Sequence, residues 1–357
     1  MANHHKVFAP AKVAGERDKI NAYLKGERIF PTTMELDLTQ LCTRACPGCP
    51  YTAGRSNRQT LELPFVSRLF DTLGGNTPGL VLSGGESTIV PHFPQTVQLA
   101  REKGIKEIAV ISNGGYTDKP VVQDALLEHV TSIRFSLYDW QDLESTYFLN
   151  TLKKIEALRH RIESEGSRLE IGASMLTICE WNDRYEPVAH RALNSGIHWL
   201  YFHPYCVDWE TGYPRQANQS GVLDAVTSLI NNSPGDANIQ VPAERYSLEP
   251  LHFEKLHGAH FLIEVGADGI LYAGPECKYE NQAVLLDLNE YLEDDFLWHP
   301  RRLERIEQMD SNHYNSIGTR HRPPMFSDYL QKLILQQKDG SEELPEESRA
   351  FSYTNIL

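Results

Sequence analysis

Short apolar runs rich in β-branched residues alternate with longer amphipathic segments between residues 11 and 205. The runs predict six strands, at 34–39, 79–83, 107–112, 132–138, 169–178 and 198–205. The segments between them carry apolar residues three and four apart, as helices do, and the helices are expected at 61–75, near 92–104, at 121–130, at 149–166 and near 184–195. Another helix is expected at 11–26. This alternation predicts βα units in a parallel sheet with right-handed crossovers.

Polar and reactive residues follow or end these predicted strands. In barrel-like folds of βα units, the carboxyl ends of the strands meet on one rim, where the chemistry gathers. The residues expected on that rim are the cysteines after the first strand, Gly84-Gly85-Glu86, Ser112-Asn113-Gly114, Ser136 and His203. The rim is therefore the predicted functional site.

The rhythm of strands and helices changes from about residue 211. The stretch FLIEVGADGILYAG (261–274) holds two apolar runs around Ala-Asp-Gly and predicts a β-hairpin, with Gly269 free to adopt a positive φ. A helix is expected at 221–232, and two or three more between 286 and 336. The resulting division is an N-terminal helical segment (1–30), a core barrel (31–210), an α+β C-terminal substrate or cap region (211–337) and an acidic tail (338–357).

Composition and charge narrow the classes of partner. The chain of 357 residues has a formal net charge of −14, which disfavours a broad nucleic-acid or anionic-membrane surface, although a local basic pocket stays compatible with it. No apolar leader and no spanning run of about 18 apolar residues is evident. We therefore expect a cytoplasmic protein without nucleic-acid or membrane partners. The sequence does not indicate an oligomeric state. In such a protein, reduced thiols usually bind a metal or take part in catalysis.

Half of the six cysteines lie in the stretch LCTRACPGCPY (41–51), as Cys42, Cys46 and Cys49. A closed structural zinc site needs four ligands, and the remaining cysteines are distant in sequence. Three thiolates suit a cubane iron–sulfur cluster that leaves one iron open to another ligand. An accidental thiol cluster and an unusual zinc loop are the alternatives.

The spacing CxxxCxxC after strand one, with a GGE after strand two, resembles the radical S-adenosylmethionine superfamily over roughly residues 30 to 206. The resemblance implies an α/β fold with a partial (β/α)6 TIM-like barrel. It also implies a [4Fe–4S] cluster held by the three cysteines, whose free iron is chelated by S-adenosyl-L-methionine. An external one-electron reductant of the flavodoxin or ferredoxin type then drives formation of a 5′-deoxyadenosyl radical, which abstracts a hydrogen atom from the substrate.

The same resemblance implies contacts to the cofactor. Gly84, Gly85 and Glu86 would follow its methionyl part, Ser136 would reach its ribose or carboxylate, and Ser112 and Asn113 would line the site. A plain glycine turn and ordinary strand-end side chains are the alternatives. The sequence departs from the family at Gly48, where an aromatic residue commonly precedes the third cysteine. Tyr51 is the candidate for that aromatic role, and an ordinary core tyrosine is its alternative.

The residues that would contact the substrate lie outside any clear motif. Cys206 and Cys277 are candidate hydrogen-atom donors and His203 a candidate acid or base, with inert buried thiols and a core histidine as alternatives. The hairpin before Cys277 is similar to a reduced SPASM/twitch-type extension, and no cysteine follows residue 277, so auxiliary clusters are not expected.

The expected substrate is a small polar metabolite, such as a sugar, a nucleoside or an amino-acid derivative. The expected reaction is a biosynthetic step of epimerisation, dehydration, decarboxylation or oxidation. Modification of a peptide is the alternative, and a non-catalytic iron–sulfur protein is the lesser one.

Overall fold

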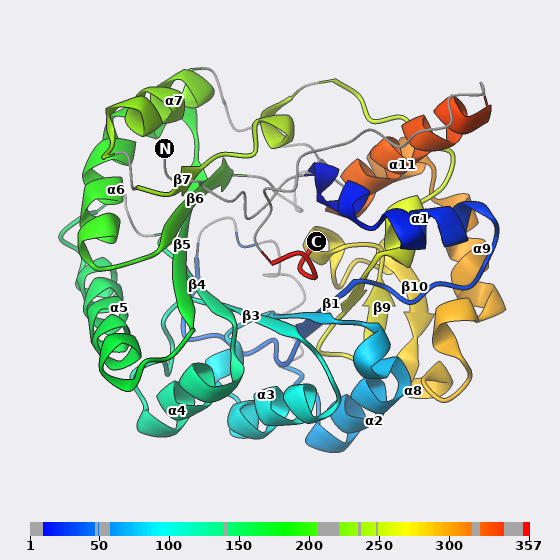
Figure 1. Cartoon of the computed structure of the whole chain (residues 1–357), viewed down its shortest axis with the longest axis horizontal. Helices are drawn as coiled ribbons and strands as arrows, with labels where there is room; N and C mark the ends of the chain where they lie inside the picture. The colour runs from blue at the N-terminus through cyan, green and yellow to red at the C-terminus, as the bar shows by residue number, and fades with distance from the viewer. Residues whose placement is uncertain are drawn as a thin grey trace.

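A computed structural model describes residues 10–46, 49, 58–138, 142–205, 221–234, 237–247, 249–315, 322–338 and 353–357. A curved, open sheet forms a wall, and helices cover its outer face (Figure 1). Two residues singled out in the sequence, Tyr51 and Cys206, lie outside the described part of the chain.

All six strands expected in the first 205 residues are present, and each pairs in parallel with the next. They are β1 (Thr33–Asp37), β2 (Gly79–Ser83), β3 (Glu107–Ser112), β4 (Ser132–Ser136), β5 (Glu170–Thr177) and β6 (Trp199–Pro204). The crossover helices are α2 (Leu63–Leu73), α3 (Phe93–Glu102), α4 (Pro120–His129), α5 (Thr146–Glu165) and α6 (Tyr185–Asn194). The parallel βα architecture is thus confirmed.

The expected N-terminal helix is shorter than its periodicity suggests. A 3₁₀ turn, Pro10–Gly15, precedes α1 (Arg17–Leu24). The turn ends at Gly15, in keeping with the poor helix propensity of glycine, and α1 starts two residues later.

The C-terminal region adds strands to both edges of this sheet. Its elements are α7 (Val222–Asn232), β7 (Ile239–Gln240), β8 (Leu262–Val265), β9 (Ile270–Tyr272), β10 (Val284–Asp287), α8 (Leu288–Tyr291), α9 (Pro300–Gln308), α10 (Ser311–Asn315) and α11 (Arg322–Lys338). The strand order is β10-β9-β8-β1-β2-β3-β4-β5-β6-β7, so the sheet does not close into a full barrel.

The predicted hairpin is confirmed as the antiparallel pair β8 and β9, with Gly269 at φ +79° between the strands. β8 also pairs in parallel with β1, which the sequence did not predict. β10 was missed as well, and its last two residues fall where a helix was expected. A pairing between strands more than 200 residues apart leaves no local periodic signal.

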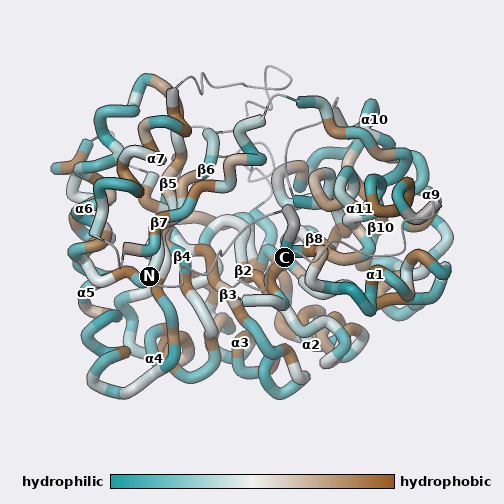
Figure 2. Tube along the Cα trace, turned by 45° about the horizontal axis from the view of Figure 1, so that its top comes forward, coloured by the Kyte–Doolittle hydropathy of each residue, from teal (hydrophilic) through white to brown (hydrophobic). Residues whose placement is uncertain are grey.

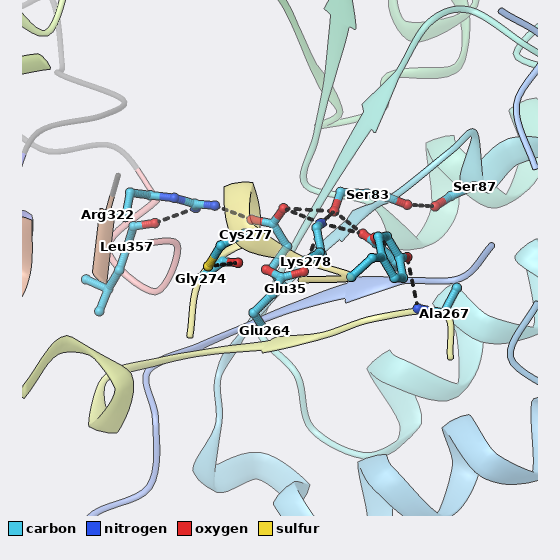
Figure 3. A network of polar contacts seen from close by, with 12 residues as sticks. Glu35, Ser83, Ser87, Glu264, Ala267, Gly274, Cys277, Lys278, Arg322 and Leu357 are labelled. Atoms are coloured by element: carbon cyan, nitrogen blue, oxygen red, sulfur yellow. Dashed lines mark hydrogen bonds and ion pairs between the residues drawn. The ribbon is translucent and has the colours of Figure 1, made fainter. Parts of the chain in front are cut away.

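The two faces of the sheet differ in polarity because successive strand residues point to opposite sides. On β1, Met34 and Leu36 join the apolar core beneath the helices. Glu35 and Asp37 instead belong to the inner polar network drawn in Figure 3. Hydrophobic stretches run along the strands in Figure 2, and hydrophilic positions mark the outer helices. Acidic residues are rarely fully buried unless they are paired, so polar contacts gather on the inner face of the sheet.

Residues 353–357 lie at the amino ends of the strands. The hydroxyl of Thr33 donates to the carbonyl of Asn355 (2.8 Å), and the amide of Leu357 donates to that hydroxyl (2.9 Å). The end of the chain therefore lies inside the curve of the sheet (Figure 1), at the mouth opposite to the predicted rim.

Candidate functional site

The cysteine loop begins directly after β1 and is pinned at its base. The hydroxyls of Thr39 and Thr60 are hydrogen bonded (2.7 Å), and the amide of Gln40 donates to the carbonyl of Gln59 (2.8 Å). The loop carries three half-buried cysteines, Cys42, Cys46 and Cys49. These bonds hold the thiols at the carboxyl end of β1, where the rim was predicted.

The Gly84-Gly85-Glu86 turn after β2 packs against the cysteine loop, backbone to backbone. The amide of Gly85 donates to the carbonyl of Thr39 (2.8 Å), and the amide of Glu86 donates to the carbonyl of Leu41 (2.9 Å). A Cβ on Gly85 would lie 2.0 Å from the oxygen of Leu41, and Gly84 adopts φ +101°. Glycine is required at both positions. The two glycines thus allow the backbone of the turn to pack closely against the loop that carries the cysteines.

Glu86 joins the ends of β2 and β3. Its side chain is fully buried, and its oxygens accept from the hydroxyl of Thr88 (2.6 Å), the hydroxyl of Ser112 (2.9 Å) and the amide of Asn113 (2.7 Å). Burial raises the pKa of this carboxyl, and the hydrogen bonds oppose the rise. Glu86 therefore organises the rim, while its predicted contact with a cofactor stays a prediction.

Asn113 links β3 to the first cysteine. Its side-chain amide donates to Sγ of Cys42 (3.2 Å), and its Oδ1 accepts from the hydroxyls of Thr43 (3.1 Å) and Tyr147 (3.3 Å). The guanidinium carbon of Arg44 lies 3.7 Å from the centroid of the Tyr147 ring, in a cation–π contact. Burial raises the pKa of Tyr147. Tyr147 was not expected at the site, because it lies in the first turn of α5 with no motif around it.

Ser136 and Ser174 are register partners on β4 and β5, and both are buried. In the part of the chain that the structure describes, the hydroxyl of Ser174 has no hydrogen-bond partner. A buried hydroxyl without a partner is costly, so Ser174 is a candidate contact for a bound molecule. Ser136 was expected at the rim, and its position at the carboxyl end of β4 agrees with that expectation.

The substrate-side candidates lie in different settings. His203, near the end of β6, stacks on Tyr201 (ring centroids 5.5 Å apart), and its Nε2 is 3.4 Å from the hydroxyl of Tyr138. Cys277 is fully buried in the apolar core, and its thiol donates to the carbonyl of Gly274 (3.2 Å). Their proposed roles stay predictions.

A cluster of buried charges inside the sheet was not expected from the sequence. Lys278 forms ion pairs with Asp37, Glu264 and Glu35. Figure 3 shows its side chain beside those of Glu35 and Glu264. The stretch MELDLT held a usable signal, because its acidic residues alternate with apolar ones, whereas strands of parallel sheets usually read as continuous apolar runs.

A [4Fe–4S] cluster fits this rim by the chemistry of its donors. One loop supplies three thiols, and an amide N–H donates to the sulfur of Cys42, the kind of bond that tunes cluster sulfurs. Across the described residues, no three His, Cys, Asp or Glu side chains are close enough together to hold a metal ion. The ligand assignment therefore rests on cysteine spacing and position. None of the described helices combines the length and apolarity needed to cross a bilayer.

Comparisons with known proteins agree with this geometry. No family model matches the chain. Over 84 residues the chain is 30% identical to 7,8-dihydro-6-hydroxymethylpterin dimethyltransferase of Methanocaldococcus jannaschii, a match that covers 22% of this chain and 16% of that protein. The chain thus spans only a small part of that relative.

Solved structures match over most of the chain. SuiB of Streptococcus suis bound to S-adenosylmethionine has a TM-score of 0.59 at 15% identity, with 81% of this chain and 71% of that chain covered. The protein anSMEcpe with bound S-adenosylmethionine has a TM-score of 0.56 at 12% identity, with 88% and 97% covered. The resemblance carried by the cysteine and glycine motifs is therefore confirmed at the level of the fold: the chain has the fold of the radical S-adenosylmethionine enzymes.

Proposed function

We propose that the chain is a radical S-adenosylmethionine enzyme whose [4Fe–4S] cluster is bound by Cys42, Cys46 and Cys49. The observation that carries the proposal is the joining of three strand ends around the cysteine loop: Asn113 contacts Cys42, and the Gly84-Gly85 turn packs on Thr39 and Leu41. When bound, the cluster and S-adenosylmethionine supply a 5′-deoxyadenosyl radical, which abstracts a hydrogen atom from the substrate.

The chain's own residues position and shield this chemistry. The three cysteines hold the cluster, and the N–H of Asn113 stabilises negative charge on the sulfur of Cys42. Ser136, on the inner face of the sheet, is proposed to contact the cofactor. Glu86 keeps the ends of β2 and β3 together through its buried hydrogen bonds. Tyr51 keeps its proposed aromatic role, and an external one-electron reductant is required.

The proposed substrate is a small polar metabolite. Its support is the polar inner face of the sheet, where Arg134, Ser174 and His203 lie on the three successive strands β4, β5 and β6. His203 is proposed as acid or base, Cys206 and Cys277 as the candidate hydrogen-atom donors, and residues 211–337 as the substrate or cap region. Cytoplasmic location belongs to this proposal as well.

A peptide substrate is the second candidate. It is favoured by two of the similar structures: SuiB has been solved bound to the precursor peptide SuiA, and anSMEcpe with the peptide Kp18Cys. Rates of cofactor cleavage measured with the small-molecule and the peptide fractions of an anaerobic extract separate the candidates. The fraction that accelerates cleavage contains the substrate.

The test of the proposed function is anaerobic reconstitution with iron and sulfide, followed by reduction and addition of S-adenosylmethionine. We expect 5′-deoxyadenosine from the wild-type protein and none from a variant with Cys42, Cys46 and Cys49 all changed to alanine. A wild-type protein that carries a full cluster yet forms no 5′-deoxyadenosine would overturn the proposal.

A further inference from the structure

A fully buried ion cluster lies on the inner face of the sheet, beside the strands that carry the rim. The ammonium group of Lys278 is 2.7 Å from Oδ1 of Asp37, 2.9 Å from Oε1 of Glu264 and 3.6 Å from Oε1 of Glu35. It also donates to the hydroxyl of Ser83 (3.3 Å). We call these five residues the Lys278 cluster (Figure 3).

The charges in this cluster depend on one another. Glu35 is also paired with Arg322. Burial acts to raise the pKa of Glu35, but the ion pairs with Arg322 and Lys278 outweigh it and lower that pKa. Burial raises the pKa of Glu264 well above its ordinary value, and the neighbouring carboxylates add to the rise. Removal of Lys278 would therefore leave buried negative charge uncompensated, which is strongly destabilising.

The backbone that delivers Lys278 is strained. Tyr279 adopts φ +69°, a left-handed conformation that bulky residues rarely take. Its hydroxyl donates to Oδ2 of Asp37 (2.9 Å) and accepts from the amide of Ala267 (3.2 Å). The strained turn thus brings two consecutive side chains, Lys278 and Tyr279, to the two oxygens of one carboxylate. Such strain persists only where the surroundings enforce it, and it is common at functional sites.

Asp37 and Ser83 are the last residues of β1 and β2, and the hydroxyl of Ser83 donates to Oδ1 of Asp37 (2.7 Å). The cysteine loop follows Asp37, and the glycine turn follows Ser83. A Cβ on Gly84 would lie 2.9 Å from Cγ of Asp37, so the turn rests on this carboxylate. Lys278 is therefore bonded to both strand ends from which the rim loops start.

We propose that Lys278 is a positioning residue: its ammonium group holds the carboxyl ends of β1 and β2 together and thereby fixes the cysteine loop and the Gly84-Gly85 turn for the cofactor. Its side chain is fully buried, so it acts through Asp37 and Ser83. The cofactor part of this inference rests on the proposed function, whereas the ordering of the loops does not.

The first test is amide hydrogen exchange in the cluster-free protein. In Lys278→Met we expect faster exchange over 38–46 and 83–86 than in the wild-type protein. The matched control is Lys12→Met, which removes another buried lysine, one that bonds the carbonyl of Ile356 at the opposite mouth. Protection of both loops that is unchanged in Lys278→Met would overturn the inference.

The second test separates positioning from simple electrostatic stability. The double variant Asp37→Asn/Lys278→Met removes one charge of each sign. We therefore expect its Tm to be higher than that of Lys278→Met and closer to that of the wild-type protein. We still expect S-adenosylmethionine to bind the reconstituted double variant at least about tenfold more weakly, with an altered electron paramagnetic resonance spectrum of the cluster. Wild-type affinity and spectrum in the double variant would overturn the inference, even if Lys278→Met itself fails to fold.

The failures of the two proposals are distinguishable. A wild-type protein that binds no S-adenosylmethionine refutes the proposed function. The exchange comparison then still decides whether Lys278 orders the rim.

Discussion

Replacing Gly85 with alanine tests how closely the glycine turn approaches the cysteine loop. The new Cβ would lie 2.0 Å from the carbonyl oxygen of Leu41. To reach an ordinary contact of 3.4 Å, the backbone at Leu41 must move by about 1.4 Å, the difference between the two distances. That oxygen accepts a hydrogen bond from the amide of Glu86, and Leu41 immediately precedes the first cysteine. The substitution therefore acts directly on the position of Cys42.

The expected cost follows from these contacts. The two backbone hydrogen bonds that join the turn to the loop contribute about 1 kcal/mol each. The strain of inserting a methyl group into packed backbone adds about 1–3 kcal/mol. We therefore expect Gly85→Ala to lower the free energy of unfolding by about 3–5 kcal/mol, and to reduce the iron bound per chain.

The assay is urea unfolding of the cluster-free protein, together with iron content after reconstitution. The control is Gly75→Ala, where the nearest atom would be 3.8 Å from the new Cβ, an ordinary contact. The control should stay within about 1 kcal/mol of wild type. If Gly85→Ala unfolds at the same urea concentration as wild type and binds as much iron, the reasoning about this contact is refuted.

Three further substitutions test individual parts of the site. Glu86→Gln replaces an acceptor with an amide donor facing the N–H of Asn113 or a hydroxyl, and should cost about 2–3 kcal/mol in urea unfolding; a neutral effect would contradict the buried hydrogen bonding. Because the pKa of Glu264 is raised, the folded protein holds that proton more tightly than the unfolded chain, and its stability falls as pH rises from about 4.5 through the raised pKa. Glu264→Gln should therefore gain stability relative to wild type as pH rises, and calorimetry that finds a constant difference would contradict this. Cys277→Ala should lower stability by about 1 kcal/mol and leave iron content unchanged, because Cys277 is buried in the apolar core and its thiol donates to the carbonyl of Gly274; loss of iron would contradict that placement.

The parts of the fold predictable from sequence were those with local patterns. β2 and β3 begin and end at the expected residues, since their apolar runs are bounded by Gly, Pro and polar residues. The rim was also predictable, because parallel strands bring their carboxyl ends together whatever the details of packing. Asn113 was expected at the site, although its bond to the sulfur of Cys42 required the structure.

The remaining features depend on contacts between distant segments. Lys278 and Asp37 are separated by 241 positions, and no local pattern links them. The parallel pairing of β8 with β1 likewise has no signature in either strand alone. Cys277 was a candidate because it is a thiol, but it lies in the apolar core. The next residue, Lys278, instead contacts the strand ends of the rim. Chemistry-bearing residue types are therefore a better guide where a motif surrounds them than where they stand alone.

The most direct test of the central claim is electron paramagnetic resonance of the reduced, reconstituted protein with and without S-adenosylmethionine. We expect a [4Fe–4S] signal that changes when S-adenosylmethionine is added, because an iron without a cysteine ligand would be open to bind it. The signal should be absent when Cys42, Cys46 and Cys49 are replaced by alanine. A four-iron signal that does not change on addition of S-adenosylmethionine, or that persists in the triple variant, would contradict the proposed cluster site.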